Sequence, residues 1–122
     1  MSYINIKIHG IPYGQDKVRG NKSALQKWTQ EIINQTMYLF PIKNACLLKA
    51  TFLLPPDKYP KDFPYGSDLD NLLKRFMDAL ENTIFSEARG VDSCVISINA
   101  IKTKVSSYEE AGVLLEILPV SI

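Results

Sequence analysis

The segment from Ser67 to Asp78 holds the residue types of this chain that are best suited to chemistry. It reads Ser-Asp-Leu-Asp-Asn-Leu-Leu-Lys-Arg-Phe-Met-Asp, and a helix beginning there would carry Asp68 and Asp70 around its first residues. Carboxylates are stabilised at that position because they accept hydrogen bonds from free backbone N–H groups and face the positive end of the helix dipole. Capping explains one aspartate well and the second less well, since a helix needs only one cap.

The same helix would place a lysine beside these carboxylates. Asp70 and Lys74 are four residues apart and therefore share a helix face, with Asn71 and Asp78 flanking the same polar side. A surface ion pair is one explanation of this spacing. Such a pair contributes only about 0.3–0.5 kcal/mol, so stability alone gives weak reason for the arrangement.

A third carboxylate, Asp92, precedes a later apolar segment. If the helix packs antiparallel to the strand that follows, Asp92 lies at the wrong end of it. It can still reach Asp68 and Asp70 if residues 84–91 run back along the sheet, because eight extended residues span up to about 26 Å. Three converging carboxylates repel unless a cation joins them, and hard oxygen ligands at an open site suit Mg²⁺ or Mn²⁺. Zinc fits less well, since His9 is the single histidine.

Such a cation next to a phosphodiester would polarise the phosphoryl oxygen and lower the pKa of a bound water. An ammonium such as that of Lys74 could orient the water or offset charge that builds up in the transition state. The residues therefore favour metal-dependent hydrolysis of a phosphodiester.

The charge distribution is compatible with a nucleic-acid substrate. Residues 1–60 carry eight basic and three acidic residues, a net charge of +5, whereas residues 61–122 carry six basic and ten acidic, a net charge of −4. A basic half could follow phosphates while an acidic half holds a cation, although small domains also divide their charges unevenly by chance. The predicted DNA contacts are Lys17, Arg19 and Lys22 in a glycine-rich loop, Lys58 and Lys61 in the proline-rich segment 55–67, and Asn71.

Hydrophobic periodicity predicts six elements that would position these residues. They are strands at about 3–9, 45–54, 93–104 and 113–118 and helices at about 24–39 and 71–83, the first helix beginning with a capping box at Ser23–Gln26. The order strand–helix–strand–helix–strand–strand predicts an α+β two-layer sandwich, with one mixed four-stranded sheet and both helices on one face. We expect a parallel crossover at the start and an antiparallel hairpin at the end.

Composition argues for one soluble domain over residues 1–122. Hydrophobic residues make up 46% and charged residues 22% of the 122 positions, which excludes a disordered or collagen-like chain. No apolar run approaches the roughly 20 residues of a membrane span, and the first residues lack a secretory pattern. Cys46 and Cys94 each lie in an apolar run, where buried thiols are the expectation. We expect a reduced, cytoplasmic protein.

The motif Asp68-Leu-Asp70-Asn71-Leu-Leu-Lys74, followed by Asp78-Ala-Leu and later by Asp92-Ser-Cys-Val, resembles the RusA family of Holliday-junction resolvases. The resemblance covers most of the chain and implies a homodimer that binds four-way junction DNA and nicks two opposed strands with Mg²⁺ or Mn²⁺. It implies that Asp68, Asp70 and Asp92 bind the metal and that Lys74 is the catalytic lysine. Ser67 replaces a residue that is often basic in the family, and the stretch before Asp92 is a few residues longer, which makes Glu87 an alternative third carboxylate.

A dimer also has a physical basis, because a four-way junction is close to two-fold symmetric and one small chain has room for one carboxylate cluster. Junction selection would then rest on shape, with basic side chains reading phosphate positions. Two other functions remain open from the sequence. One is a nuclease for other branched DNA, and the other is a DNA-binding accessory protein in which the carboxylates only cap a helix.

Overall fold

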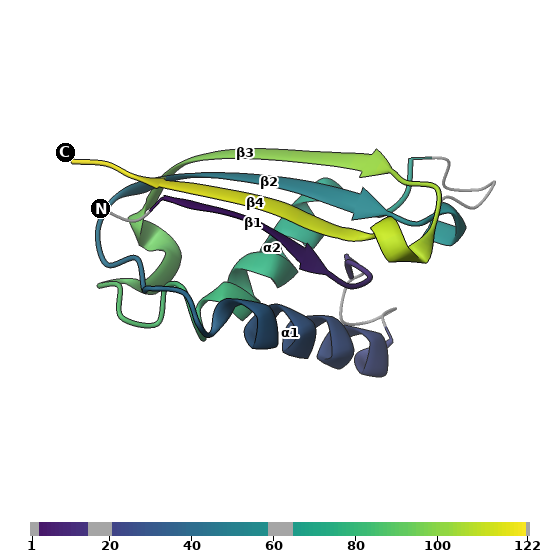
Figure 1. Ribbon diagram of the computed structural model, residues 1–122, viewed down its shortest axis with the longest axis horizontal. Coiled ribbons are helices and arrows are strands. Elements are labelled where there is room, and N and C mark those ends of the chain that lie inside the picture. Colours follow the sequence, from purple (N-terminus) through teal and green to yellow (C-terminus); the bar gives the residue numbers. More distant parts are fainter. Residues whose placement is uncertain (1–2, 15–20, 59–64, 122) are drawn as a thin grey trace.

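The computed structural model describes residues 3–14, 21–58 and 65–121 of the chain. Within these ranges, four strands form one mixed sheet and two α-helices cover one of its faces (Figure 1). The strands are β1 (Ile4–His9), β2 (Cys46–Leu54), β3 (Val95–Lys104) and β4 (Gly112–Pro119), the helices are α1 (Lys22–Thr36) and α2 (Leu69–Leu80), and the 3-10 turns are η1 (Pro56–Lys58), η2 (Val91–Cys94) and η3 (Tyr108–Glu110). The predicted α+β two-layer sandwich is confirmed.

The strand order β1-β4-β2-β3 differs from the expected one at the end of the chain. β4 pairs antiparallel with both β1 and β2, whereas β3 pairs parallel with β2. The predicted final hairpin is therefore wrong, since β3 and β4 lie on opposite sides of β2. The physical reason is burial: Val113, Leu115 and Ile117 of β4 are fully buried, and a central strand buries such a face better than an edge strand does.

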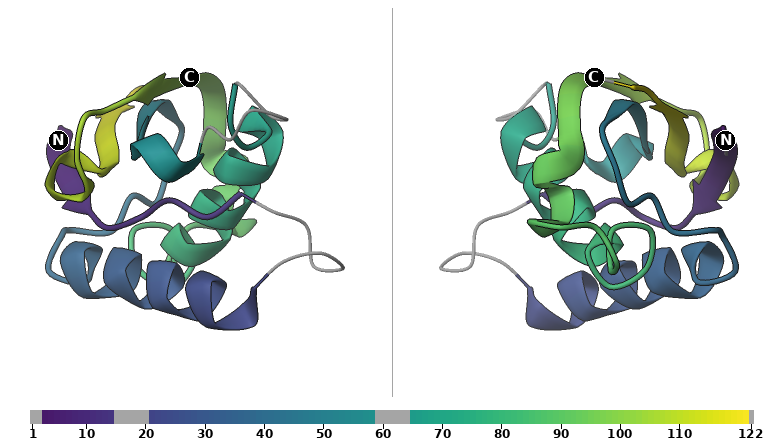
Figure 2. Two further views of the ribbon diagram at one scale, coloured as in Figure 1. Left: turned by 90° about the vertical axis from the view of Figure 1, so that its right-hand side faces the viewer. Right: turned by 90° about the vertical axis from the view of Figure 1, so that its left-hand side faces the viewer.

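The core lies between the sheet and the helices. Inward-facing residues of β2 alternate with exposed ones, and Phe52 at the middle of the core meets Phe76 of α2 in an edge-to-face contact with ring centroids 5.7 Å apart. Each such aromatic side chain contributes about 1.5–3 kcal/mol by leaving water. Helix α2 also contacts β3, α1 contacts β1 and α2, and both helices lie below the same face of the sheet (Figure 2).

Helix α1 begins and ends differently from the expectation. Its N-cap is Asn21, whose Oδ1 accepts hydrogen bonds from the backbone N–H groups of Ser23 and Ala24 at 2.9 and 3.3 Å. The predicted capping box is therefore wrong, because asparagine caps well and stands two residues earlier. The helix ends at Thr36, whose Oγ1 lies 2.6 Å from Oγ1 of Thr83 and ties this end of α1 to the chain after α2.

Strand β3 lies at one edge of the sheet and is mostly exposed. It begins at Val95, so Cys94, expected within the strand, belongs to η2. Ile96 and Ile98 of β3 are 50% and 44% exposed. β3 therefore presents unpaired backbone groups and apolar side chains along the same edge.

The two free thiols, Cys46 and Cys94, are both buried, as the sequence indicates. Burial and the adjacent Cys94 thiol raise the pKa of Cys46 to about 12. Neither α1 nor α2, the helices of the described ranges, combines the length and hydropathy that crossing a bilayer requires.

Candidate functional site

The first turn of α2 exposes two carboxylates that do little for the helix. Asp68 is the N-cap residue, with extended backbone (φ −61°, ψ 134°), yet its side chain makes no capping hydrogen bond. Asp70 accepts one hydrogen bond, from the N–H of its neighbour Asn71 at 3.0 Å. Both side chains are exposed. A capping role therefore does not account for Asp68, although it was the simplest structural explanation of the sequence.

Lys74 lies one turn further along the same exposed face of α2. The spacing allows an ion pair between Lys74 and Asp70, but these two side chains do not form one in the structure. In the described ranges, neither the Asp68 carboxylate nor the Lys74 ammonium has a hydrogen-bond or ion-pair partner. An acidic pair and an ammonium group thus stand close together and available to a ligand.

The turn that leads into α2 is held from two sides. Gly66 adopts a left-handed conformation (φ 76°) that disfavours a side chain, and the carbonyl of Ser67 accepts a hydrogen bond from Nζ of Lys102 at 2.8 Å. A Cβ atom at Gly14 would lie 2.7 Å from the Leu72 side chain and 3.0 Å from Cβ of Ser67. The position of Asp68 is therefore set by β3 and by the segment after β1.

Asp92 lies at the other end of α2. It is part of η2, and its carboxylate lies near that of Glu81, the C-cap residue of α2. Partial burial, together with the charges of Asp92 and Asp78, raises the pKa of Glu81. Since α2 has 12 residues, about 18 Å separates this acidic group from the start of the helix.

Residues 84–91 do not run back along the sheet. Ile84 and Phe85 are fully buried, and the carbonyl of Ile84 accepts a hydrogen bond from the N–H of Ile42 at 2.8 Å. These contacts hold the segment beside the end of α1. One chain thus does not bring Asp92 to Asp68 and Asp70, and the described ranges contain no cluster of three histidine, cysteine or acidic side chains able to hold a metal ion.

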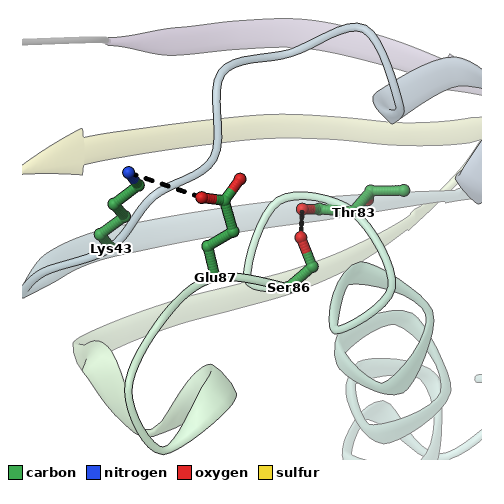
Figure 3. Close-up of polar contacts among 4 residues, drawn as sticks. All are labelled: Lys43, Thr83, Ser86 and Glu87. Atoms are coloured by element: carbon green, nitrogen blue, oxygen red, sulfur yellow. Dashed lines mark hydrogen bonds and ion pairs between the residues drawn. The ribbon is translucent and has the colours of Figure 1, made fainter.

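Glu87 does not replace Asp92 near the start of α2. Its carboxylate lies 3.5 Å from Nζ of Lys43 on the connection into β2, and the same turn is closed by a hydrogen bond from Oγ of Ser86 to the carbonyl of Thr83 at 2.8 Å (Figure 3). Both partners of the ion pair are more than half exposed, so the pair contributes little to stability. Glu87 therefore belongs to the end of the molecule that carries Asp92.

The predicted DNA contacts are only partly covered by the structure. Lys22 is exposed at the first residue of α1, Asn71 is half-buried in the first turn of α2, and Lys58 ends η1. Lys17, Arg19 and Lys61 lie outside the described residues. The structure adds Lys102, which the sequence places only in a strand and which the fold pairs in register with the buried Phe52.

Neither a protein-family model nor a curated protein sequence matches this chain.

Proposed function

We propose that this protein is a metal-dependent endonuclease for branched DNA, and specifically a resolvase of four-way junctions like those of the RusA family. The observation that carries the proposal is the exposed, unengaged group at the start of α2. Asp68 occupies an N-cap position without capping, Asp70 follows it, and Lys74 stands one turn away without an ion pair. Since carboxylates and an ammonium side by side are the groups that a metal-assisted phosphodiester hydrolysis needs, function explains them better than stability does.

The third carboxylate would come from a second copy of the chain. β3 runs antiparallel to α2, because Lys102 near its end contacts Ser67 while Asp92 before its start contacts Glu81. If two β3 edges pair antiparallel about a two-fold axis near Ile98, the start of one strand lies beside the end of the other. Asp92 of the partner subunit would then approach Asp68 and Asp70.

The surface of β3 supports this dimer. Its outer backbone groups have no neighbouring strand in the sheet, and an exposed edge with apolar side chains is prone to pair with another chain. Ile96, Ile98 and Ile101 are 50%, 44% and 40% exposed. Pairing would bury these side chains and satisfy the edge hydrogen bonds at the same time.

In this arrangement Asp68, Asp70 and the partner's Asp92 would hold Mg²⁺ or Mn²⁺, the ions that oxygen ligands at an open site favour. A bound ion of this kind supplies Lewis-acid polarisation of the phosphodiester and a water of lowered pKa. Lys74 would stabilise negative charge on the phosphate oxygens in the transition state. The two-fold axis would place two such sites symmetrically, as paired nicks in a four-way junction require.

Cleavage of an immobile four-way junction in Mn²⁺ tests the proposal. The wild-type protein is expected to give paired, symmetric nicks, whereas Asp70→Asn should bind the junction and fail to cut it, because the change removes a ligand charge and no phosphate contact. The matched control is Glu109→Gln, which removes one exposed carboxylate on η3 and should cut normally. Cleavage by Asp70→Asn at the wild-type rate would refute the assigned site, and a preference for other branched substrates over four-way junctions would refute the narrower assignment.

The dimer has its own test. Ile98→Asp places a charge on the proposed axis, so sedimentation should show a monomer. This monomer should still unfold in one cooperative thermal transition but should no longer cut the junction. A variant that remains dimeric would place the interface elsewhere.

One observation favours a second candidate, a DNA-binding accessory protein without catalysis: a single chain has no cluster of three metal-ligating side chains in its described ranges. Tight junction binding by the wild type, with no cleavage in Mg²⁺ or Mn²⁺, would establish that function instead.

A further inference from the structure

We infer that Lys102 is a positioning residue for the carboxylate group at the start of α2; the inference rests on the proposed function for its catalytic consequence. Lys102 lies near the end of β3 and pairs in register with Phe52, so its side chain enters the layer between sheet and helices. There its Nζ donates a hydrogen bond to the carbonyl of Ser67 at 2.8 Å, across 35 residues of sequence. This contact ties the edge strand directly to the residue that precedes Asp68.

The turn needs such a contact because little else in the backbone fixes it. Asp68 does not cap α2 through its side chain, and the first helical hydrogen bond here runs from the N–H of Leu72 to the carbonyl of Asp68 at 3.1 Å. Gly66, with its left-handed backbone, provides a pivot of high intrinsic freedom just before. The Lys102 ammonium, half-buried and hydrogen-bonded, restrains this pivot.

Gly14 supplies a second restraint on the turn. It packs so closely that an added Cβ would collide with Leu72 and press on Ser67. Ser67 is thus restrained both by the close approach of Gly14 and by a charged hydrogen bond from Lys102. Without this hydrogen bond, the close packing of Gly14 still restricts the space available to the turn. It does not orient the Ser67 carbonyl.

The consequence for the site follows from the place of Lys102 in the proposed dimer. Pairing near Ile98 would set the end of β3 beside the start of the partner's β3, so the strand that carries Lys102 would also be the interface strand. The same side chain would then fix Asp68 relative to the interface and hence relative to Asp92 of the partner subunit. Groups that orient metal ligands in this way typically change metal affinity or activity about 10–100-fold when they are removed.

Lys102→Met removes the donor and keeps the apolar stem. We expect the affinity of the protein for Mn²⁺, measured by titration calorimetry without DNA, to weaken about tenfold. We also expect kcat for junction cleavage to fall with KM unchanged. Hydrogen exchange at the Leu72 amide should quicken about tenfold, because a charged hydrogen bond shifts a local opening equilibrium by about that factor. Lys102→Arg, which offers donors at a similar reach, should restore all three. Lys49→Met, which removes a lysine from the opposite face of the sheet, is the matched control and should resemble the wild type.

Each result decides the inference. If Lys102→Met raises KM with kcat unchanged, Lys102 contacts a phosphate and positions nothing; if Leu72 exchange is unchanged, the restraint on the turn is refuted. If Lys102→Met quickens exchange at the Leu72 amide but keeps wild-type cutting and wild-type Mn²⁺ affinity, the link between Lys102 and the carboxylates is refuted. If the wild type neither binds Mn²⁺ nor cuts DNA, the proposed function fails, and the exchange rate still decides whether Lys102 fixes this turn.

Discussion

Complementation between two inactive variants tests the shared site most directly. Asp70→Asn and Asp92→Asn should each abolish cutting alone, because every site of either homodimer lacks one ligand. In a mixed dimer of the two variants, one site combines both substitutions and is dead. The other combines the intact start of α2 from the Asp92→Asn chain with intact Asp92 from the Asp70→Asn chain, so it is complete. Mixing two dead proteins should therefore restore nicking.

The size of the recovery follows from the geometry. The start of α2 and Asp92 are separated by about 18 Å of helix within one chain, so one subunit cannot complete a site alone. Random exchange of subunits at equal concentration makes about half of the dimers mixed, each with one intact site of two, and recovery should approach about a quarter of the wild-type nicking rate. The products should be single nicks, without the paired, symmetric cuts proposed for the wild type.

The assay is a junction labelled on each strand in turn, incubated in Mn²⁺ after the variants have been mixed and exchanged. The control is a mixture of Asp68→Asn with Asp70→Asn, which removes ligands from the same side of both sites and should stay inactive. A mixture of Asp70→Asn and Asp92→Asn that remains as inactive as its parts, with mixed dimers demonstrated by mass spectrometry, refutes the shared site.

Three further outcomes follow from the structure. Asp70→Asn should unfold in EDTA at the same temperature as the wild type or slightly above, because asparagine keeps an Oδ1 that can accept from the N–H of Asn71 and the relieved repulsion from Asp68 offsets the lost interaction with the helix dipole; a clear drop in the thermal midpoint would show that Asp70 stabilises the helix start. The pKa of Glu81 is raised by burial and by Asp92, so the favourable contribution of Glu81 is present below its unfolded pKa and lost as pH rises through its folded pKa. Glu81→Gln should therefore gain stability relative to the wild type as pH rises above the ordinary glutamate pKa of about 4, measured by urea unfolding, and a pH-independent difference contradicts this. Phe76→Ala should cost about 3–5 kcal/mol in the same assay, since Phe76 is fully buried, and a loss below about 1 kcal/mol would show that the core repacks around the gap.

The elements themselves were predictable because their signals are local. Alternating isoleucines predict the strand over 3–9, observed as Ile4–His9, and the apolar stripe that contains Leu72 and Phe76 predicts the second helix, observed two residues earlier than expected at Leu69. The first helix was predicted to end three residues too late, because Leu39 and Phe40 continue its spacing while the helix ends at Thr36. Hydrophobic periodicity predicts which residues share a face of a helix or strand. It does not predict where tertiary contacts end that helix or strand.

The sequence by itself determined the two-layer α+β architecture and the grouping of Asp68, Asp70 and Lys74, since a helix places residues within one turn of each other wherever it lies. Only the tertiary structure decided that β4 enters between β1 and β2, that β3 becomes an exposed edge, and that Asp92 lies by Glu81. These outcomes depend on strand pairing between distant segments and on the burial of Ile84 and Phe85. The free energy of each is a sum over many tertiary contacts. Residue spacing alone does not predict the strand order or the position of Asp92, because the same spacing is compatible with several strand orders. Packing of the whole core determines which order forms.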